Sequence, residues 1–380
     1  MQITTSTNGA ATTLRVDGRL DVDTIETLKS ALTGVTTEQL VFDMRGCNFV
    51  SSIGIREILK AHRERSRYGG SIALVHVNKD VMDIFRITGM TEMMDIKAIT
   101  REISMDGLEF LSAGVCGKCY RMDRETVVKL YNDGIDASIA EREKEYAKAA
   151  FVLGIPTAIS YDVVACGSQT GVVYEMLDAE LFSVVIRADI DNMATHGRML
   201  AAVAKAIHEV EPAPGVFPDI KERFRGYIRE MDFFLPEADV AFLLRKLEEI
   251  PDAGTCVHFD IHSSNIMIRD GEPVIIDMGD LSTGSFLFDI GLLLTIYGIP
   301  ELGISELATK IPNEKGVELW EAFRAAYFTD LDTATIAYID ANIAFLASLR
   351  VIYSITFLPA LRDSLCTMMT DILLPRMPRD

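Results

Sequence analysis

The residues best suited to chemistry lie between His258 and Asp280. Asp260 is followed five positions later by Asn265, and a second aspartate, Asp277, comes directly after a short apolar strand. The first Asp can take or orient the proton of an attacking hydroxyl. The Asn oxygen and the second Asp can hold magnesium ions that neutralise a triphosphate. The pattern therefore predicts phosphoryl transfer, which needs positioning and charge compensation more than covalent chemistry.

The neighbouring residues make this interpretation more specific than an Asp-x4-Asn pair alone. His258 precedes the first Asp by two positions, and Asp289 opens an Asp-Ile-Gly segment. These residues resemble the catalytic core of the kinase-like superfamily, and most closely its aminoglycoside and choline phosphotransferase branch. Phe259 stands where that branch typically has Gly, and Met278 stands where it has Phe. We expect His258 and Asp289 to support the loop rather than to take part in chemistry.

A phosphate-binding segment is expected upstream of these loops. Gly114 and Gly117 separate two expected strands within residues 110–120, where glycines let backbone amides approach phosphate oxygens. The next apolar strand, residues 126–131, carries a single lysine, Lys129. A lysine in such a strand is normally a solvated edge residue, but this position resembles the kinase lysine that grips the α- and β-phosphates.

That lysine needs an acidic partner, which we expect on the following helix. Ser138 as N-cap and Glu141 as a capping-box glutamate predict that the helix begins there. The segment resembles the family's pairing-glutamate helix, with Glu143 as the partner. The later strand 172–177 resembles the hinge between kinase lobes, so residues Glu175 to Leu177 are expected to contact the adenine of ATP through their backbone.

The spacing of the acidic residues bears on the branch of the superfamily. Only 12 residues separate Asp277 from Asp289, and the chain has no Ala-Pro-Glu signature. A long regulated activation loop has no room there. His262 also stands where protein kinases usually carry Lys. Both features favour the small-molecule phosphotransferase branch in fold, but fold does not fix the substrate.

The first third of the chain has a different pattern. Alternating strands and amphipathic helices predict a small α/β domain with a mixed sheet. The expected strands are 2–5, 12–16, 40–44 and 71–77; the expected helices are 25–32 (capped by Asp23 or Thr24), one beginning near Ser52, and 79–85; and Gly18 to Asp21 is expected to form a turn.

This pattern resembles the STAS domain of anti-sigma factor antagonists over residues 1–98. The resemblance rests on Gly18-Arg-Leu-Asp21, on residues 50–55 and on 87–90. In such antagonists a serine at a helix start is phosphorylated, and that position falls here on Ser52, preceded by Ser51 where the family has Asp. A helix N-terminus suits a phosphate. The alternative is that either serine merely caps the helix, and many such domains bind ligands or partners without known phosphorylation.

Composition limits the remaining choices. The chain has 380 residues and a net charge of −19, which argues against nonspecific nucleic-acid binding. The apolar runs 288–300 and 336–361 are too short or carry charges, so we read them as buried helices and expect no membrane partner. Six cysteines and the lack of a signal peptide favour the cytoplasm. Cys116 and Cys119 lack a second pair for zinc, which leaves a redox switch as an open alternative.

The expected fold is therefore α/β plus α+β, a STAS domain followed by a bilobal protein-kinase-like fold. We assign 1–99 to the STAS domain, 100–106 to a linker, 107–178 to a β-rich small lobe and 179–380 to a helical large lobe. Helices of the large lobe are expected at 193–210, 220–231, 238–250, 317–329 and 334–355.

Three functions remain open at this point. The first is an ATP- and Mg²⁺-dependent kinase coupled to the STAS module in signalling, with Ser52 as candidate phosphoacceptor and an anti-sigma factor or another signalling protein as partner. The second is a small-molecule kinase with a sensory or docking STAS domain. The third is a non-catalytic ATP-binding switch. In the first two, Asp260 is the base and Asn265 and Asp277 hold metal. Lys129 and Glu143 position the phosphates.

Overall fold

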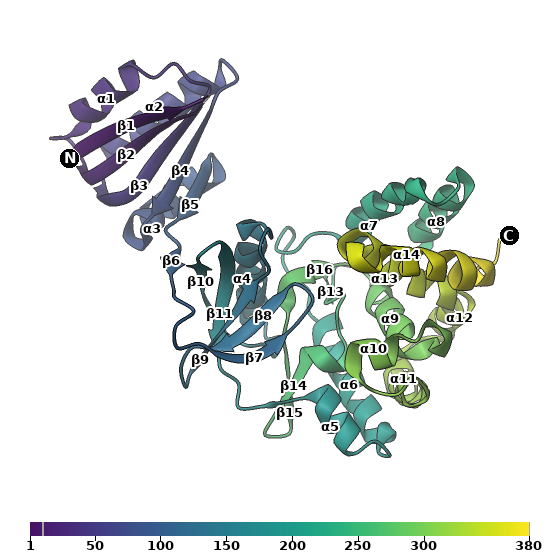
Figure 1. Cartoon of the computed structure of the whole chain (residues 1–380). Coiled ribbons are helices and arrows are strands. Elements are labelled where there is room, and N and C mark those ends of the chain that lie inside the picture. Colours follow the sequence, from purple (N-terminus) through teal and green to yellow (C-terminus); the bar gives the residue numbers. More distant parts are fainter. Residues whose placement is uncertain (10, 380) are drawn as a thin grey trace. The chain divides into compact units, whose positions relative to one another are not determined.

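The computed structural model describes residues 1–9 and 11–379, and the chain divides into two compact units, Met1–Glu102 and Ile103–Asp380. The first unit is built on a five-stranded sheet (Figure 1). In sheet order its strands are β1 (Gln2–Asn8), β2 (Ala11–Leu20), β3 (Gln39–Val50), β4 (Ser71–Val77) and β5 (Asp95–Ala98). β1 is antiparallel to β2 and the other pairs are parallel, so the mixed sheet expected from the sequence is confirmed.

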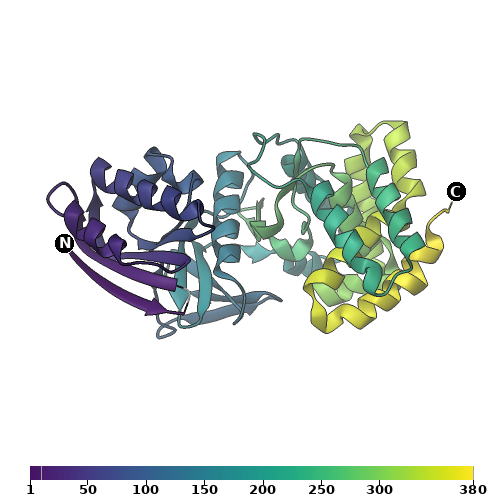
Figure 2. The ribbon, with the colours of Figure 1, turned by 90° about the horizontal axis from the view of Figure 1, so that it is seen from above.

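Three helices link the parallel strands of this sheet. They are α1 (Ile25–Thr33), α2 (Ser52–Ser66) and α3 (Lys79–Ile87). Right-handed crossovers that all advance in one direction place such helices on one face of the sheet, and Figure 2 shows them gathered there. Alternate residues of β3, Leu40, Phe42 and Met44, point into the resulting core, where Phe85 of α3 is also fully buried.

The expected turn at 18–21 is wrong for its first three residues. β2 continues through Leu20, and the register of its pairing with β3 shifts between Gly18 and Arg19. Gly18 adopts φ +107°, which a glycine accepts without steric cost, so the strand absorbs a bulge instead of turning. The chain turns at Asp21, whose carbonyl accepts a hydrogen bond from the amide of Thr24 at 3.1 Å.

The start of α2 is defined by Ser51 and Gly54. The Ser51 hydroxyl caps the helix by accepting a hydrogen bond from the Gly54 amide at 3.5 Å, and Ser52 is the first helical residue, with an exposed side chain. A Cβ on Gly54 would lie 2.7 Å from Cγ of Leu20, so only glycine lets the helix approach the end of β2 this closely. The cap is therefore Ser51, and Ser52 is left facing solvent.

The second unit begins with a strand-rich lobe. Its sheet has the order β6-β10-β11-β9-β8-β7, in which β6 is formed by the two residues that precede the boundary of this unit. The bounds are β6 (Arg101–Glu102), β7 (Glu109–Ala113), β8 (Gly117–Arg121), β9 (Thr126–Tyr131), β10 (Ser160–Cys166) and β11 (Gln169–Glu175). The helix α4 (Ala137–Val152) connects β9 to β10, and its buried residues Ala140 and Ala147 are small enough for close packing.

The predicted cap of α4 is wrong by two residues. Asp136 is the N-cap, and its carboxylate accepts a hydrogen bond from the Ser138 amide at 2.8 Å. Ser138 already lies inside the helix, so Ser138 and Glu141 do not form a capping box. An aspartate is as good a cap as serine and also places negative charge at the helix N-terminus.

The rest of the second unit is mainly helical, as expected. Its helices are α5 (Phe182–Ala188), α6 (Met193–His208), α7 (Ile220–Arg229), α8 (Glu237–Glu249), α9 (Leu287–Leu293), α10 (Ile304–Thr309), α11 (Asn313–Tyr327), α12 (Thr333–Ala341), α13 (Ile343–Phe357) and α14 (Arg362–Thr367). Short strands lie among them: β12 (Glu180–Leu181), β13 (Cys256–Val257), β14 (Ile266–Arg269), β15 (Glu272–Ile275) and β16 (Ser282–Thr283). One large hydrophobic core holds the helices together.

The predicted helix 334–355 is in fact two helices. α12 and α13 meet at Asn342 with a bend of 63°. The Asn342 side chain donates to the carbonyl of Tyr338 at 2.8 Å, a local bond that competes with helical backbone pairing. Across residues 1–9 and 11–379 no single helix could span a membrane, and only this bent pair reaches the required length and apolarity.

Candidate active site

A buried ion pair joins strand β9 to helix α4 within the strand-rich lobe. Nζ of Lys129, on β9, lies 3.0 Å from both carboxylate oxygens of Glu143, which is only 2% exposed. The hydroxyls of Tyr131 and Tyr174 also donate to this carboxylate, the second at 2.6 Å. Three donors therefore fix Glu143 in one orientation. The structure thus brings together Lys129 and Glu143, which the sequence analysis expected to be partners.

The same lysine reaches the loop after β15. Its Nζ donates to Oδ1 of Asp277 at 2.8 Å. Burial alone would lower the pKa of Lys129, but the charges of Asp277 and Glu143 outweigh it and hold the pKa well above its ordinary value. Burial and the Glu143 charge raise the pKa of Tyr174, which stays protonated and able to donate. The lysine is thus a permanent cation between two carboxylates.

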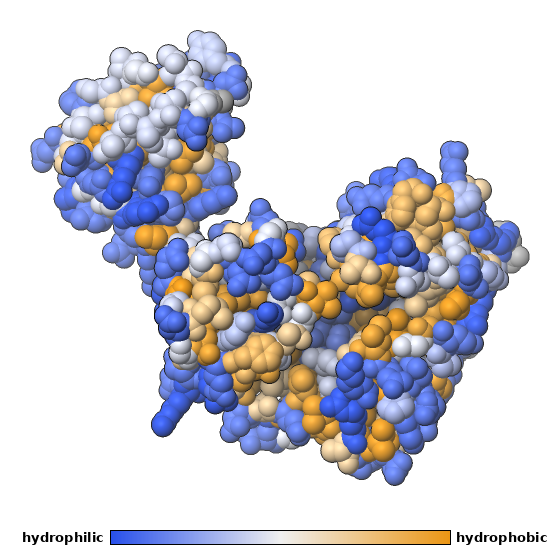
Figure 3. Space-filling model, viewed as in Figure 1, coloured by the Kyte–Doolittle hydropathy of each residue, from blue (hydrophilic) through white to orange (hydrophobic). Residues whose placement is uncertain are grey.

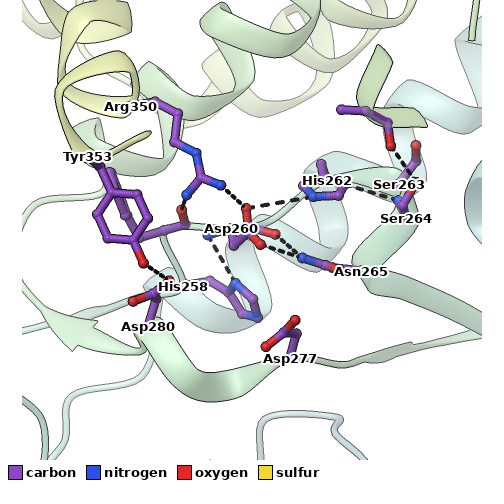
Figure 4. A network of polar contacts seen from close by, with 12 residues as sticks. His258, Asp260, His262, Ser263, Ser264, Asn265, Asp277, Asp280, Arg350 and Tyr353 are labelled. Atoms are coloured by element: carbon purple, nitrogen blue, oxygen red, sulfur yellow. Dashed lines mark hydrogen bonds and ion pairs between the residues drawn. The ribbon is translucent and has the colours of Figure 1, made fainter. Parts of the chain in front are cut away.

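The loop after β13 carries Asp260, whose carboxylate has three polar neighbours (Figure 4). Its Oδ1 accepts from Arg350 at 2.7 Å and lies 3.6 Å from Nε2 of His262, and its Oδ2 accepts from the Asn265 amide at 2.8 Å. Burial would raise the pKa of Asp260, but Arg350 and the nearby histidines outweigh it and lower the pKa below its ordinary value. Asp260 is therefore a carboxylate at neutral pH.

Asp289, the third residue of α9, holds the backbone of that loop by hydrogen bonds. Its Oδ2 accepts from the His258 amide at 2.9 Å and its Oδ1 from the Phe259 amide at 2.6 Å. His208 of α6 contacts the same carboxylate at 2.9 Å, and Tyr327 of α11 bonds the other ring nitrogen of His208 at 2.7 Å. All of these groups are buried, so the loop is tied to three helices of the core.

The loop after β15 has an unusual backbone at Asp277. This residue adopts φ +66°, in the left-handed region, and its carboxylate is 42% exposed. Three residues later Asp280 accepts hydrogen bonds from Arg223 at 3.2 Å and from the Tyr353 hydroxyl at 2.5 Å. Helices α7 and α13 therefore anchor the end of this loop, while Asp277 stays accessible beside Asn265 (Figure 4).

Two family models match the chain over the two units. The STAS domain model matches residues 2–103, and the model of the phosphotransferase enzyme family matches residues 111–335, more than half of the chain. The chain belongs to the phosphotransferase enzyme family. In sequence order, an N-terminal STAS domain precedes this kinase-like domain, which confirms the fold expected from the sequence.

Solved structures with a similar fold include aminoglycoside and choline kinases. The gentamicin complex of APH(2″)-IIa is 15% identical, with a TM-score of 0.46 over 70% of this chain and 91% of that chain. A GDP complex of an aminoglycoside 2′-phosphotransferase IIIa variant is 13% identical, with a TM-score of 0.49 over 72% and 92%. A choline/ethanolamine kinase family protein from Mesorhizobium loti is 14% identical, with a TM-score of 0.44 over 72% and 91%. At this similarity none of them identifies a substrate. A search of curated proteins gave no match.

The glycine segment of this phosphotransferase domain is a tight hairpin between β7 and β8. The Gly114 amide donates to the Gly117 carbonyl at 2.8 Å, and a Cβ on Gly117 would lie 2.3 Å from the Leu130 carbonyl oxygen. Gly117 is thus required by packing, whereas a Cβ on Gly114 would meet protein only at 3.8 Å. Burial raises the pKa of both the Cys116 and the Cys119 thiols, so neither is an activated thiolate.

The expected hinge begins at Glu175, the last residue of β11, and runs to Leu177. Figure 3 shows a hollow between the strand-rich part and the helical part of the phosphotransferase domain. The Glu175 carboxylate accepts from the Ile159 amide at 3.0 Å, and its backbone amide donates to the Ile159 carbonyl at 2.9 Å. Leu177 is buried. The side chain of Glu175 therefore holds the hinge, and contact with adenine by the backbone stays a prediction.

Several polar groups at this site were missed by the sequence analysis. Arg350 and Tyr353 come from α13, about 90 residues after Asp260, and Arg223 comes from α7. One signal was present for the first: Arg350 and Asp340 are the two charged residues in the apolar stretch 336–361. A charge in such a helix usually has a buried partner.

Proposed function

We propose that the chain is an ATP- and Mg²⁺-dependent kinase that transfers the γ-phosphoryl group of ATP to a hydroxyl acceptor. The observation that carries this proposal is the convergence of three segments on one site. Lys129 from β9 meets Asp277 from the loop after β15 at 2.8 Å, and Asn265 meets Asp260 at 2.8 Å. A fixed cation, a carboxylate base and two oxygen donors are the parts that phosphoryl transfer needs.

The nucleotide would be held from the strand-rich side. Lys129, kept in place by Glu143, would bind the α- and β-phosphates, and backbone amides around Gly114 and Gly117 would approach the phosphate oxygens. The backbone from Glu175 to Leu177 would contact adenine. Because Lys129 has an excess of carboxylate neighbours in this structure, a phosphate could replace Asp277 as its partner without loss of charge balance.

The residues present fit magnesium. The Asn265 NH₂ group donates to both the carbonyl and the carboxylate of Asp260, which turns its amide oxygen away from Asp260. That oxygen and the carboxylate of Asp277 are hard donors of the kind that Mg²⁺ prefers. Within residues 1–9 and 11–379 no cluster of three or more His, Cys, Asp or Glu is arranged for a metal, and Mg²⁺ in kinase sites takes further ligands from substrate phosphates. When bound, magnesium neutralises charge on the triphosphate.

The Asp260 carboxylate would serve as the base. The acceptor oxygen attacks the γ-phosphorus and forms a new P–O bond, while the bond to the β-phosphate oxygen breaks and ADP leaves. The acceptor proton passes to Asp260, which is ionised at neutral pH and can take it. Asp289 contributes by holding the backbone of this loop at His258 and Phe259.

We further propose that the kinase acts in a signalling circuit through its STAS domain, with Ser52 as the phosphoacceptor. The Ser52 side chain is exposed at the first turn of α2, while Ser51 takes the capping role. A phosphate there would meet the free amides and positive end of a 15-residue helix. It would also change the charge that an anti-sigma factor or other signalling partner meets.

A small-molecule acceptor is the second candidate, and one observation favours it. Between Asp277 and Asp289 the chain forms a 3-10 turn at 278–280, the two-residue strand β16 and the first two residues of α9. This segment does not leave room for a long loop of the kind that presents protein substrates in protein kinases. An aminoglycoside-like or choline-like hydroxyl compound would then be the acceptor, and the STAS domain would sense or dock.

Intact-mass spectrometry after incubation with Mg-ATP separates these candidates. We expect a gain of one phosphate in the wild-type chain that is lost in both Ser52→Ala and Asp260→Asn. ATP turnover that needs Asp260, without any gain in mass, would direct the search to small molecules or another protein. ATP binding with neither turnover nor mass gain would refute the kinase proposal and favour a non-catalytic switch.

A further inference from the structure

Arg350 makes a two-pronged contact with the loop that carries Asp260. One guanidinium nitrogen donates to Oδ1 of Asp260 at 2.7 Å, and the other donates to the carbonyl of Phe259 at 3.0 Å. The planar fork of an arginine suits two acceptors at once, whereas a lysine offers a single charged point. Arg350 thus fixes both the side chain of Asp260 and the peptide bond that precedes it.

The guanidinium is itself held in place. It lies over the rings of Tyr353, at 5.0 Å from the centroid, and of Phe259, at 5.6 Å, and its side chain is only 19% exposed. Charge-assisted bonds in such a partly dehydrated position are stronger than those of exposed ion pairs. The Asp260 carboxylate is therefore oriented by a rigid group rather than by a mobile surface side chain (Figure 4).

Phe259 shows why the loop needs this support. It adopts φ +62°, where a residue other than glycine is strained, and it stands where the resembled branch has Gly. Asp289 binds its amide at 2.6 Å and Arg350 binds its carbonyl, so charged groups clamp both ends of the residue. Its ring packs against Phe224 and Tyr353 at centroid distances of 5.2 and 5.3 Å. The strain persists because the surroundings determine the conformation.

The helix that carries Arg350 also reaches the metal-side loop. Tyr353 lies one turn further along α13 and donates to Asp280 at 2.5 Å, while Arg223 of α7 contacts the same carboxylate at 3.2 Å. Residues three apart lie on one face of a helix. One face of α13 therefore contacts the loop of Asp260 and the loop of Asp277, which sets the separation of the two loops.

We propose that Arg350 is a positioning residue of the phosphotransferase site, which orients the Asp260 carboxylate toward the acceptor and, with Tyr353, makes α13 the element that fixes the distance between the base and the metal-binding loop. This inference rests on the proposed role of Asp260 as the base. Arg350 itself transfers no proton and binds no phosphate.

The test measures Mg-ATP turnover by the full chain, with water as the acceptor. In Arg350→Gln we expect kcat to fall about 100-fold, the cost of a small misplacement of a catalytic group. The KM for Mg-ATP should stay within about twofold, because the contacts of Arg350 lie on the side of Asp260 and not of Lys129. Arg350→Lys should recover only part of the loss, since it keeps the charge but not the fork.

A matched control comes from α11. Arg324 donates to both carboxylate oxygens of Asp340 at 2.9 Å, and its guanidinium lies over the ring of Phe328 at 5.2 Å. This arginine–aspartate pair resembles that of Arg350 and Asp260 but does not involve Asp260. Arg324→Gln should leave kcat unchanged. A double-mutant cycle in thermal unfolding provides a second readout: Arg350→Gln should lower the midpoint less in the Asp260→Asn background than in the wild type.

The outcomes separate this inference from the proposed function. Turnover that needs Asp260 but is equal in wild type and Arg350→Gln would overturn the positioning role and leave the kinase proposal intact. A wild-type chain with neither turnover nor a gain in mass would refute the kinase proposal, and the cycle would then decide whether Arg350 holds Asp260. Additive losses in the cycle would overturn the inference in either case.

Discussion

Glu143 offers the sharpest test of how the site is built. Its buried carboxylate accepts from Lys129, Tyr131 and Tyr174, so Glu143→Leu removes an acceptor that three donors share. Lys129 keeps Asp277, but the two tyrosine hydroxyls are stranded. A buried unsatisfied polar group costs about 1–3 kcal/mol, so we expect a loss of about 4 kcal/mol in the free energy of unfolding.

A second background shows whether this reasoning is right. If stranded donors cause the loss, Glu143→Leu should cost far less when Tyr131 and Tyr174 are both phenylalanine, because acceptor and donors are then removed together. The exposed Glu141, on the same helix, supplies a control: Glu141→Leu should change stability by less than about 0.5 kcal/mol.

The assay is urea unfolding followed by the fluorescence of Trp320. This is the single tryptophan of the chain, and it is buried in α11 of the second unit, so its signal reports on the phosphotransferase domain and not on the STAS domain. A cost below about 1 kcal/mol, or an equal cost in the phenylalanine background, would refute the explanation.

Three further predictions concern the proposed metal site and the STAS domain. In Asp277→Asn the Mg²⁺ concentration for half-maximal turnover should rise about 10- to 100-fold, measured by titrating Mg²⁺ after chelation. The pKa of Asp43 lies below its ordinary value, because hydrogen bonds from a neighbouring arginine amide and a histidine outweigh burial, which alone would raise it. Its contribution to stability is therefore present above the unfolded-state pKa and is lost as the pH falls below about 4, and Asp43→Asn should weaken this acid dependence. Gly54→Ala places a Cβ 2.7 Å from Cγ of Leu20 and should cost about 1–3 kcal/mol. Both STAS variants can be followed by circular dichroism during unfolding. The part of the change that is not accompanied by a change in Trp320 fluorescence reports on the STAS domain.

Local patterns account for the parts of the site that the sequence predicted. Lys129 is the single lysine of β9, a strand in which the residues on either side of it are buried. Glu143 lies on the helix that follows β9, so a short connection brings the two residues together. Asp260 and Asn265 lie in one loop. The hairpin of β14 and β15 begins directly after that loop, and Asp277 follows the hairpin. Contacts of this kind follow from the order of the elements along the chain.

The contacts that were missed join distant segments. Arg350 lies 90 residues from Asp260, and no local spacing connects them. The break at Asn342 was missed because helix propensity over the apolar stretch is high, and a single asparagine side chain that bonds backward to a carbonyl decided the bend. The cap of α4 was missed because Asp136 and Ser138 are both good caps, and the fold uses the first.

The bonds from Asp289 to the loop of Asp260 have a consequence for the motions of the site. The amides of His258 and Phe259 donate hydrogen bonds to the Asp289 carboxylate, which is fully buried among α6, α9 and α11. They can exchange with solvent only when those helices separate, so their opening free energy should approach that of the whole helical lobe. We expect the hairpin at Gly114 and Gly117 to open locally at a lower free energy, because β7 beside it is exposed along its length. If Asp260 is the base and this hairpin covers the phosphates, as proposed, the base stays still on the timescale of turnover while the hairpin moves.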